Sequence, residues 1–157
     1  MKSALGVGIS VEFWLPASKS HVALEEKDER VEVPNTQKSL RILAVDDDAL
    51  VLMNTAAMLE ELGHQVRDAS SAQEALEIMR REPRFDIIVT DMAMPHMNGL
   101  EFARAIWSDW PGLPVLLATG YAELPEIPER KLQIVSKPFG QSELLKGIEA
   151  ALAERAA

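Results

Sequence analysis

Residues 42–48 of the chain read ILAVDDD, four apolar residues followed directly by three carboxylates. A short continuous apolar run is typical of a central strand in a parallel sheet, because such a strand is buried on both faces. Similar runs recur at residues 87–90, 115–118 and 134–136, and Val66 marks a further short strand. Stretches with helical periodicity separate these runs. Strands that alternate with helices predict an α/β fold with a parallel sheet and right-handed crossovers.

The helices between these strands have recognisable starts and core-facing stripes. We expect helices over about residues 49–62, from residue 71 onward, over about 100–107 and over about 142–155. Asp48 is predicted to be the N-cap of the first helix, and Gly63 suits its C-terminal cap. The sequence Ser71-Ala-Gln-Glu74 is read as a capping box that opens the second helix. The apolar face of the first helix is predicted to comprise Val51, Met58, Leu59 and Leu62.

Polar side chains follow four of the predicted strands at their carboxyl ends. Asp46–Asp48 follow the first strand, Asp91 the third, Thr119 the fourth and Lys137 the fifth. In open parallel sheets, ligands bind beyond the carboxyl ends of the strands. Because four separate segments agree on one sheet edge, the sequence predicts a functional site there.

Composition excludes several classes of function. The 157 residues carry a formal net charge of −9, which disfavours direct nucleic-acid binding because neutralising phosphates needs a basic face. Cysteine is absent, so disulfides, thiolate metal sites and cysteine nucleophiles are excluded. The three histidines lie far apart without metal-ligand spacing, and no apolar run is long enough for a membrane helix. We therefore expect a protein that contacts neither nucleic acid nor membrane.

Five short motifs, in order along residues 40–155, resemble the receiver domain of two-component response regulators. Val45–Asp48 resembles the acidic pair of that family, Thr90–Pro95 its phosphoacceptor loop and Met97–Gly99 the glycine turn that follows. Ala118–Tyr121 resembles its Ser/Thr position, and Val135–Phe139 its Lys-Pro signature with a cis peptide before the proline. The resemblance implies a flavodoxin-like (βα)5 three-layer sandwich over residues 40–157, with a five-stranded sheet of order 2-1-3-4-5.

The resemblance also implies a chemistry, which the residue types support. Asp91 is expected to be phosphorylated, acting as the nucleophile that attacks phosphorus and forms an aspartyl phosphate. Lys137 supplies a point charge that can pair first with Asp91 and then with a phosphoryl oxygen. Thr119 can donate its hydroxyl to another phosphoryl oxygen. The expected catalytic residues are therefore Asp91, Thr119 and Lys137.

Mg²⁺ is the expected cofactor, since it prefers octahedral oxygen ligands and keeps several waters. Asp47 and Asp91 can supply carboxylate oxygens, Asp46 can contact the ion directly or through water, and the Ala93 carbonyl can add one more ligand. Clustered carboxylates repel one another without the metal, so metal binding and phosphorylation are expected to be coupled.

The function that follows is phosphorelay signalling in the cytoplasm. The phosphoryl donor would be a histidine kinase or a histidine phosphotransfer protein, and a downstream protein would receive the signal. The domain would catalyse its own phosphorylation and dephosphorylation, with no kinase activity from this chain. Two alternatives remain: a Mg²⁺-dependent aspartyl-phosphate phosphatase and a binding-only pseudo-receiver. Such phosphatases need a second acid two positions after the nucleophile, where this chain has Ala93.

The remaining segments depart from a plain receiver. Residues 1–16 resemble the last strand of a histidine-kinase ATP-binding domain, which implies a hybrid-kinase context, and residues 17–39 read as a linker. No nucleotide-binding boxes accompany that strand, so ATP binding is not expected. Ile134 occupies the position of an aromatic residue that is common in the family. The segment 121–133 contains two prolines, so we expect a short or irregular fourth helix.

Overall fold

The computed structural model describes residues 2–3, 9–10, 38–82, 84–120 and 132–156. The chain divides into two units, residues 1–37 and 38–157. In the first unit, β1 (Lys2–Ser3) and β2 (Ile9–Ser10) pair antiparallel. The rest of the predicted N-terminal strand, and the predicted linker up to residue 37, lie outside the described residues.

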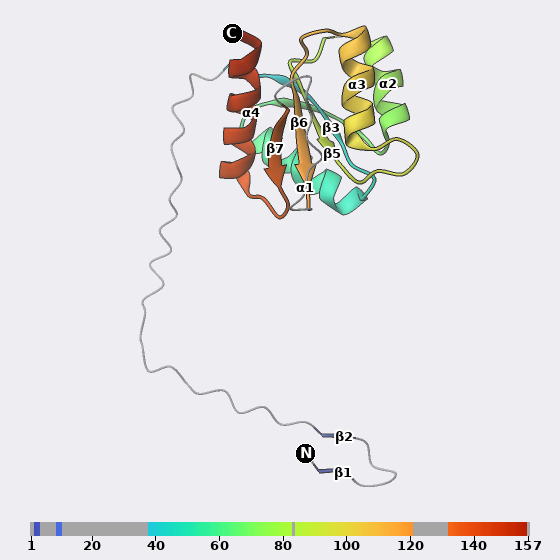
Figure 1. Ribbon diagram of the computed structural model, residues 1–157. Coiled ribbons are helices and arrows are strands. Elements are labelled where there is room, and N and C mark those ends of the chain that lie inside the picture. The colour runs from blue at the N-terminus through green and yellow to red at the C-terminus, as the bar shows by residue number, and fades with distance from the viewer. Residues whose placement is uncertain (1, 4–8, 11–37, 83, 121–131, 157) are drawn as a thin grey trace, which may run out of the picture. The chain divides into compact units, whose positions relative to one another are not determined.

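The second unit is a five-stranded parallel sheet between two layers of helices (Figure 1). Its strand order is β4-β3-β5-β6-β7, which confirms the predicted order 2-1-3-4-5. Helices α2 and α3 pack on one face of the sheet, and α1 and α4 on the other. In chain order the elements are β3 (Arg41–Val45), α1 (Ala49–Glu61), β4 (Gln65–Ala69), α2 (Ala72–Arg81), β5 (Ile87–Asp91), α3 (Gly99–Asp109), β6 (Val115–Thr119), β7 (Gln133–Ser136) and α4 (Gln141–Ala156).

Alternate residues of the central strands fill two separate cores. Leu43 and Ile88 belong to the core under α2 and α3, whereas Ile42 and Ile87 belong to the core under α1 and α4. All four side chains are fully buried. This two-sided burial is the physical reason for the continuous apolar runs in the sequence. Among the described helices, none combines the length and apolarity that crossing a membrane requires.

Local capping explains where the helices begin and end. The Asp48 carboxylate accepts the backbone N–H groups of Leu50 and Val51, at 2.9 and 3.2 Å, which confirms it as the N-cap of α1. Gly63 follows the helix with φ +87° and donates its N–H to the Glu60 carbonyl. A left-handed residue at this point commonly ends a helix, and glycine adopts that conformation without a Cβ clash.

The predicted capping box of α2 is only half correct. The Ser71 hydroxyl accepts the Glu74 N–H, but the Glu74 carboxylate accepts the N–H and hydroxyl of Ser70 rather than of Ser71. These bonds, the hydroxyl first, lower the pKa of Glu74. A complete capping box instead opens α3, where Asn98 and Glu101 accept each other's backbone N–H.

The predicted core face of α1 is also partly wrong. The structure buries Leu52, Thr55 and Leu59, and it leaves Leu50 and Met53 exposed by 72% and 65%. Residues 49–59 carry no charged side chain, so the helix is apolar or neutral all round and its sequence marks no solvent face. The predicted irregular fourth helix falls mostly in residues 121–131, which lie outside the described residues.

Candidate functional site

The site lies where four parallel strands end, as the sequence predicted. Asp46 follows β3, Asp91 is the last residue of β5, Thr119 is the last residue of β6, and Lys137 follows β7. Asp46, Asp91 and Thr119 are 6%, 7% and 2% exposed, so polar groups are concentrated in a largely buried place. Asp47, beside them, is exposed.

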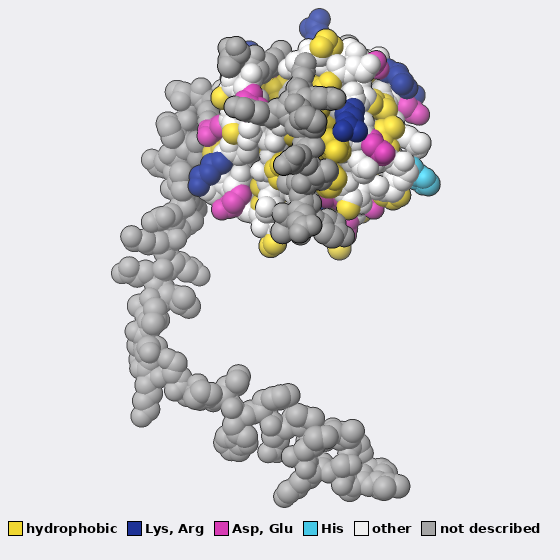
Figure 2. Space-filling model, viewed as in Figure 1, with side chains coloured by type: hydrophobic (Ala, Val, Ile, Leu, Met, Phe, Trp, Pro, Cys, Tyr) yellow, Lys and Arg dark blue, Asp and Glu magenta, His cyan; other side chains and the backbone are white. Residues whose placement is uncertain are grey.

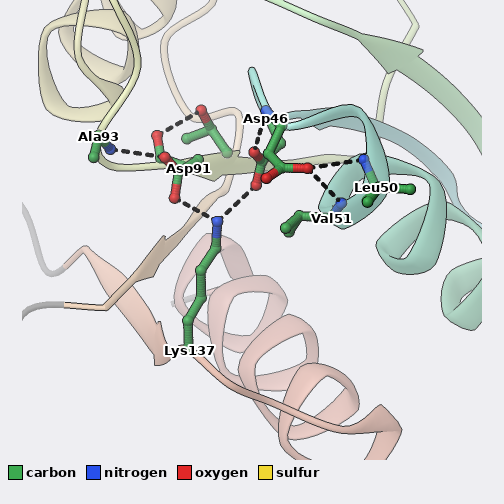
Figure 3. A network of polar contacts seen from close by, with 8 residues as sticks. Asp46, Leu50, Val51, Asp91, Ala93 and Lys137 are labelled. Atoms are coloured by element: carbon green, nitrogen blue, oxygen red, sulfur yellow. Dashed lines mark hydrogen bonds and ion pairs between the residues drawn. The ribbon is translucent and has the colours of Figure 1, made fainter. Parts of the chain in front are cut away.

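Lys137 joins the two buried carboxylates. Its Nζ lies 2.7 Å from Asp46 Oδ2 and 2.7 Å from Asp91 Oδ1 (Figure 3). The lysine follows β7, the edge strand of the sheet, and its ammonium points between the two acids. Burial alone would lower the pKa of Lys137, but its hydrogen bonds and ion pairs with Asp46 and Asp91 outweigh burial and raise it. The lysine therefore stays charged over the physiological pH range.

Backbone groups hold the other oxygens of these carboxylates. The Asp48 N–H donates to Asp46 Oδ1 at 2.9 Å, and the Ala93 N–H donates to Asp91 Oδ2 at 2.9 Å (Figure 3). Both donors lie in the loops that leave the strands, so the path of each loop orients one carboxylate. Lys137 is anchored similarly, because its own backbone N–H donates to the Thr119 carbonyl at 2.7 Å.

Three acids could together hold a metal ion. Asp46, Asp47 and Asp91 each offer a carboxylate oxygen, and these oxygens lie within 4.8 Å of one another. Mg²⁺ binds oxygens at about 2.0–2.1 Å in an octahedron, so adjacent and opposite ligand oxygens are roughly 3–4 Å apart. Small side-chain adjustments would meet that requirement, and an all-oxygen donor set suits Mg²⁺. The residues present therefore fit the expected ion.

Two features of the site were not evident from local sequence patterns. A Cβ on Gly99 would clash with the Asp91 backbone carbonyl and lie 2.6 Å from Leu117 Cδ1, so α3 can begin this close to β5 only with glycine. A small pocket, partly open to solvent, lies beside both buried acids and is also lined by Thr55 and Phe139. The periodicity of α1 did not point to Thr55.

Comparisons with known proteins identify the family to which this fold belongs. The family model of the response regulator receiver domain matches residues 42–149. The chain belongs to the response regulator receiver domain family. Receiver domains serve two-component signalling, in which a phosphorelay from a kinase is the general function, and they typically bind Mg²⁺ at an acidic pocket. They interact with histidine kinases or phosphotransfer proteins.

Several relatives of this receiver domain are known. The response regulator receiver protein CpdR of Brucella abortus is 33% identical over 71% of the chain and 96% of CpdR. The sensor kinase CckA of the same organism is 31% identical over 96% of the chain, which spans only 17% of CckA. A receiver domain structure from Clostridium thermocellum superposes with a TM-score of 0.68 and 29% identity, covering 74% of this chain and 97% of that one.

Proposed function

We propose that this receiver accepts a phosphoryl group from a phosphohistidine onto Asp91, with Mg²⁺ bound, and signals through protein contacts. The observation that carries the proposal is the pair of buried acids, Asp46 and Asp91, that one lysine bridges at 2.7 Å from each. A phosphoacceptor needs an ionised carboxylate next to a fixed positive charge, because negative charge accumulates on the phosphoryl oxygens during transfer.

In the transfer step, the N–P bond of the phosphohistidine breaks while an O–P bond forms at the Asp91 carboxylate. The departing imidazole nitrogen takes a proton from solvent. Lys137 pairs with a phosphoryl oxygen, and the Thr119 hydroxyl donates to another. Both residues sit at the carboxyl ends of neighbouring strands, and the Thr119 carbonyl already holds the Lys137 backbone.

Asp46, Asp47 and Asp91 would hold the ion, with the Ala93 carbonyl as a further ligand. When bound, Mg²⁺ neutralises negative charge on the phosphoryl oxygens. The hydrogen bond from the Ala93 N–H to Asp91 keeps that carboxylate turned toward the sheet edge where the site lies. Together these groups hold the attacking oxygen in place before the donor arrives.

The phosphoryl donor is proposed to be a histidine kinase or histidine phosphotransfer protein. Exposed Leu50 and Met53 lie in the first turns of α1, shortly after the acidic run Asp46–Asp48, and offer apolar contact area at the start of that helix. Scattered apolar residues are ordinary on surfaces, but two adjacent ones at the rim of a site favour a docking role. The donor would reach the site over this end of α1.

The context is proposed to be that of a hybrid kinase. Residues 1–16 would be a remnant of a kinase ATP-binding domain, and residues 17–39 a linker to the receiver in residues 40–157. Similarity to CckA over 96% of the chain supports this interpretation, as does the β1–β2 pairing. Such a protein would act in the cytoplasm. On the face that Figure 2 shows, positive and negative side chains of the described residues are interspersed, which suits protein partners more than nucleic acid.

Incubation with acetyl phosphate and Mg²⁺ tests the proposal. We expect a base-labile phosphoprotein, with labelling lost in Asp91→Asn and in the presence of a chelator. Asp109→Asn is the matched control, because Asp109 is an exposed acid at the end of α3. Labelling that persists in Asp91→Asn would overturn the site assignment. Fast turnover of generic phosphoesters would favour the phosphatase alternative, and absence of labelling would favour the pseudo-receiver.

A further inference from the structure

One polar residue interrupts the buried face of α1. Thr55 is 6% exposed, and the other buried residues of this helix are Leu52 and Leu59. Taking a hydroxyl out of water costs free energy unless it is hydrogen-bonded, yet no described protein group bonds the Thr55 hydroxyl. Among the described side chains, His64 Nε2 is the one fully enclosed polar atom without a partner, so the Thr55 hydroxyl borders an open space. The pocket beside the two acids is that space, because Thr55 lines it.

This pocket lies on the side of the sheet that α1 and α4 cover. Ala44 and Val89 face that side, in the core under the two helices. Side chains alternate along a strand, so Asp46 and Asp91, each two residues further on, project to the same side. All four residues line the pocket together with Thr55. The hydroxyl and the two carboxylates therefore border one shared space.

The pocket is suited to an ordered water. It has room for about one water molecule, and a buried water typically makes about three hydrogen bonds to otherwise unsatisfied polar groups. Carboxylate oxygens of Asp46 and Asp91 lie within 4.8 Å of one another, a separation that one water bonded to both at about 2.8 Å can span.

Both carboxylates can accept a further hydrogen bond. Each oxygen of an ionised carboxylate offers about two lone-pair sites. Asp46 accepts the Asp48 N–H on one oxygen and the Lys137 ammonium on the other. Asp91 pairs with the same ammonium and accepts the Ala93 N–H on its second oxygen. Accepting capacity therefore remains on both acids, while the donor that could fix the direction of a water between them is the Thr55 hydroxyl.

We propose that Thr55 is a positioning residue for the phosphoacceptor, acting through a water in this pocket. The Thr55 hydroxyl donates to the water oxygen, which leaves the two water hydrogens to donate to Asp46 and Asp91. The water joins the carboxylates at a second point besides Lys137, and it limits rotation of the Asp91 carboxylate before it attacks phosphorus. This inference rests on the proposed function, because it gives Thr55 a part in the phosphorylation of Asp91.

Two substitutions in the full chain separate the hydroxyl from the shape of the side chain. Thr55→Val keeps the shape and removes the hydroxyl, whereas Thr55→Ser keeps the hydroxyl and removes the methyl group. With acetyl phosphate and Mg²⁺, labelling should slow by about fivefold in Thr55→Val, as for the loss of one hydrogen bond, and stay within about twofold of wild type in Thr55→Ser. Asn54→Ala is the matched control, because it removes an exposed polar side chain from the same helix, and it should be labelled as wild type is.

Thermal unfolding distinguishes positioning from packing. Loss of a buried methyl group destabilises a core, so Thr55→Ser should unfold at a lower temperature than wild type although its labelling is nearly normal. If Thr55 only filled space, labelling would follow stability instead: Thr55→Ser would be slowed, and Thr55→Val would react at the wild-type rate. That pattern, or equal slowing of both variants, would overturn the inference.

A high-resolution crystal structure of the wild-type protein tests the water without any phosphoryl donor. We expect a water within hydrogen-bond distance of Thr55 Oγ1 and of both carboxylates. A pocket without this water, with the Thr55 hydroxyl donating to the carbonyl of Val51 four residues earlier, would overturn the inference. Wild-type protein that is not labelled at all would refute the proposed function, whereas labelled wild type with the wrong order of variants would refute the inference alone.

Discussion

Replacing Gly99 by alanine should destabilise the domain although alanine is the better helix former. Gly99 is the first residue of α3, and a methyl group there would lie 2.6 Å from Leu117 Cδ1 and closer still to the Asp91 carbonyl oxygen. Ordinary carbon contacts are about 3.5–4.0 Å, so the neighbours must move by roughly 1 Å. Overpacking of this kind costs about 1–3 kcal/mol. The upper end applies because one neighbour is backbone.

The gain in helix propensity from glycine to alanine is at most about 1 kcal/mol, so the clash prevails by about 2 kcal/mol. In a domain of this size that loss lowers the Tm by roughly 8 °C. Thermal unfolding followed by circular dichroism measures it. Because the displaced atom belongs to Asp91, the proposed phosphoacceptor, labelling by acetyl phosphate should also slow by about tenfold or more.

Gly120→Ala is the matched control, because a Cβ there would meet no atom of the described residues within 4 Å. Its stability should stay within about 0.5 kcal/mol of wild type, as for most surface substitutions. If Gly99→Ala unfolded at the wild-type temperature and were labelled at the wild-type rate, the argument from close approach would be refuted.

Three further predictions concern stability and partner recognition. Burial lowers the pKa of His64 from its usual value of 6.5, so on acidification the unfolded chain takes up this proton before the folded protein does. The free energy of unfolding should therefore fall as pH drops below about 6.5. Urea titrations across pH should show a smaller fall in His64→Gln but not in His96→Asn. Leu50→Gln with Met53→Gln should slow phosphoryl transfer from a phosphorylated histidine kinase while acetyl phosphate labelling is unchanged; equal slowing of both reactions would argue against docking on α1. Asn98→Ala removes the N-cap of α3 and should cost about 1 kcal/mol in urea unfolding, and an unchanged midpoint would contradict that role.

The sequence predicted the strands and the members of the site because both depend on simple geometry. Strands buried on two faces appear as continuous apolar runs, and the carboxyl ends of parallel strands meet at one edge. Residues as distant in sequence as Asp46 and Lys137 could therefore be placed together. The Asp48 N-cap followed equally directly from its place between a strand and an apolar helix.

Other features depended on packing that no local pattern encodes. The core face of α1 was misassigned because residues 49–59 carry no charge, so their spacing does not separate a buried face from an exposed one. Glu74 bonds Ser70 instead of Ser71, a shift of one residue that two adjacent serines leave undecided. The bridging position of Lys137, with both acids at 2.7 Å, required the strand register across the sheet.

Locating the modified residue tests whether Asp91 is the phosphoacceptor. After labelling with acetyl phosphate and Mg²⁺, borohydride converts an aspartyl phosphate to homoserine, which peptide mass spectrometry can place in the sequence. We expect homoserine at position 91 alone, and none when Mg²⁺ is chelated. Homoserine at Asp46 or Asp47, or labelled protein with an unmodified Asp91, would contradict it.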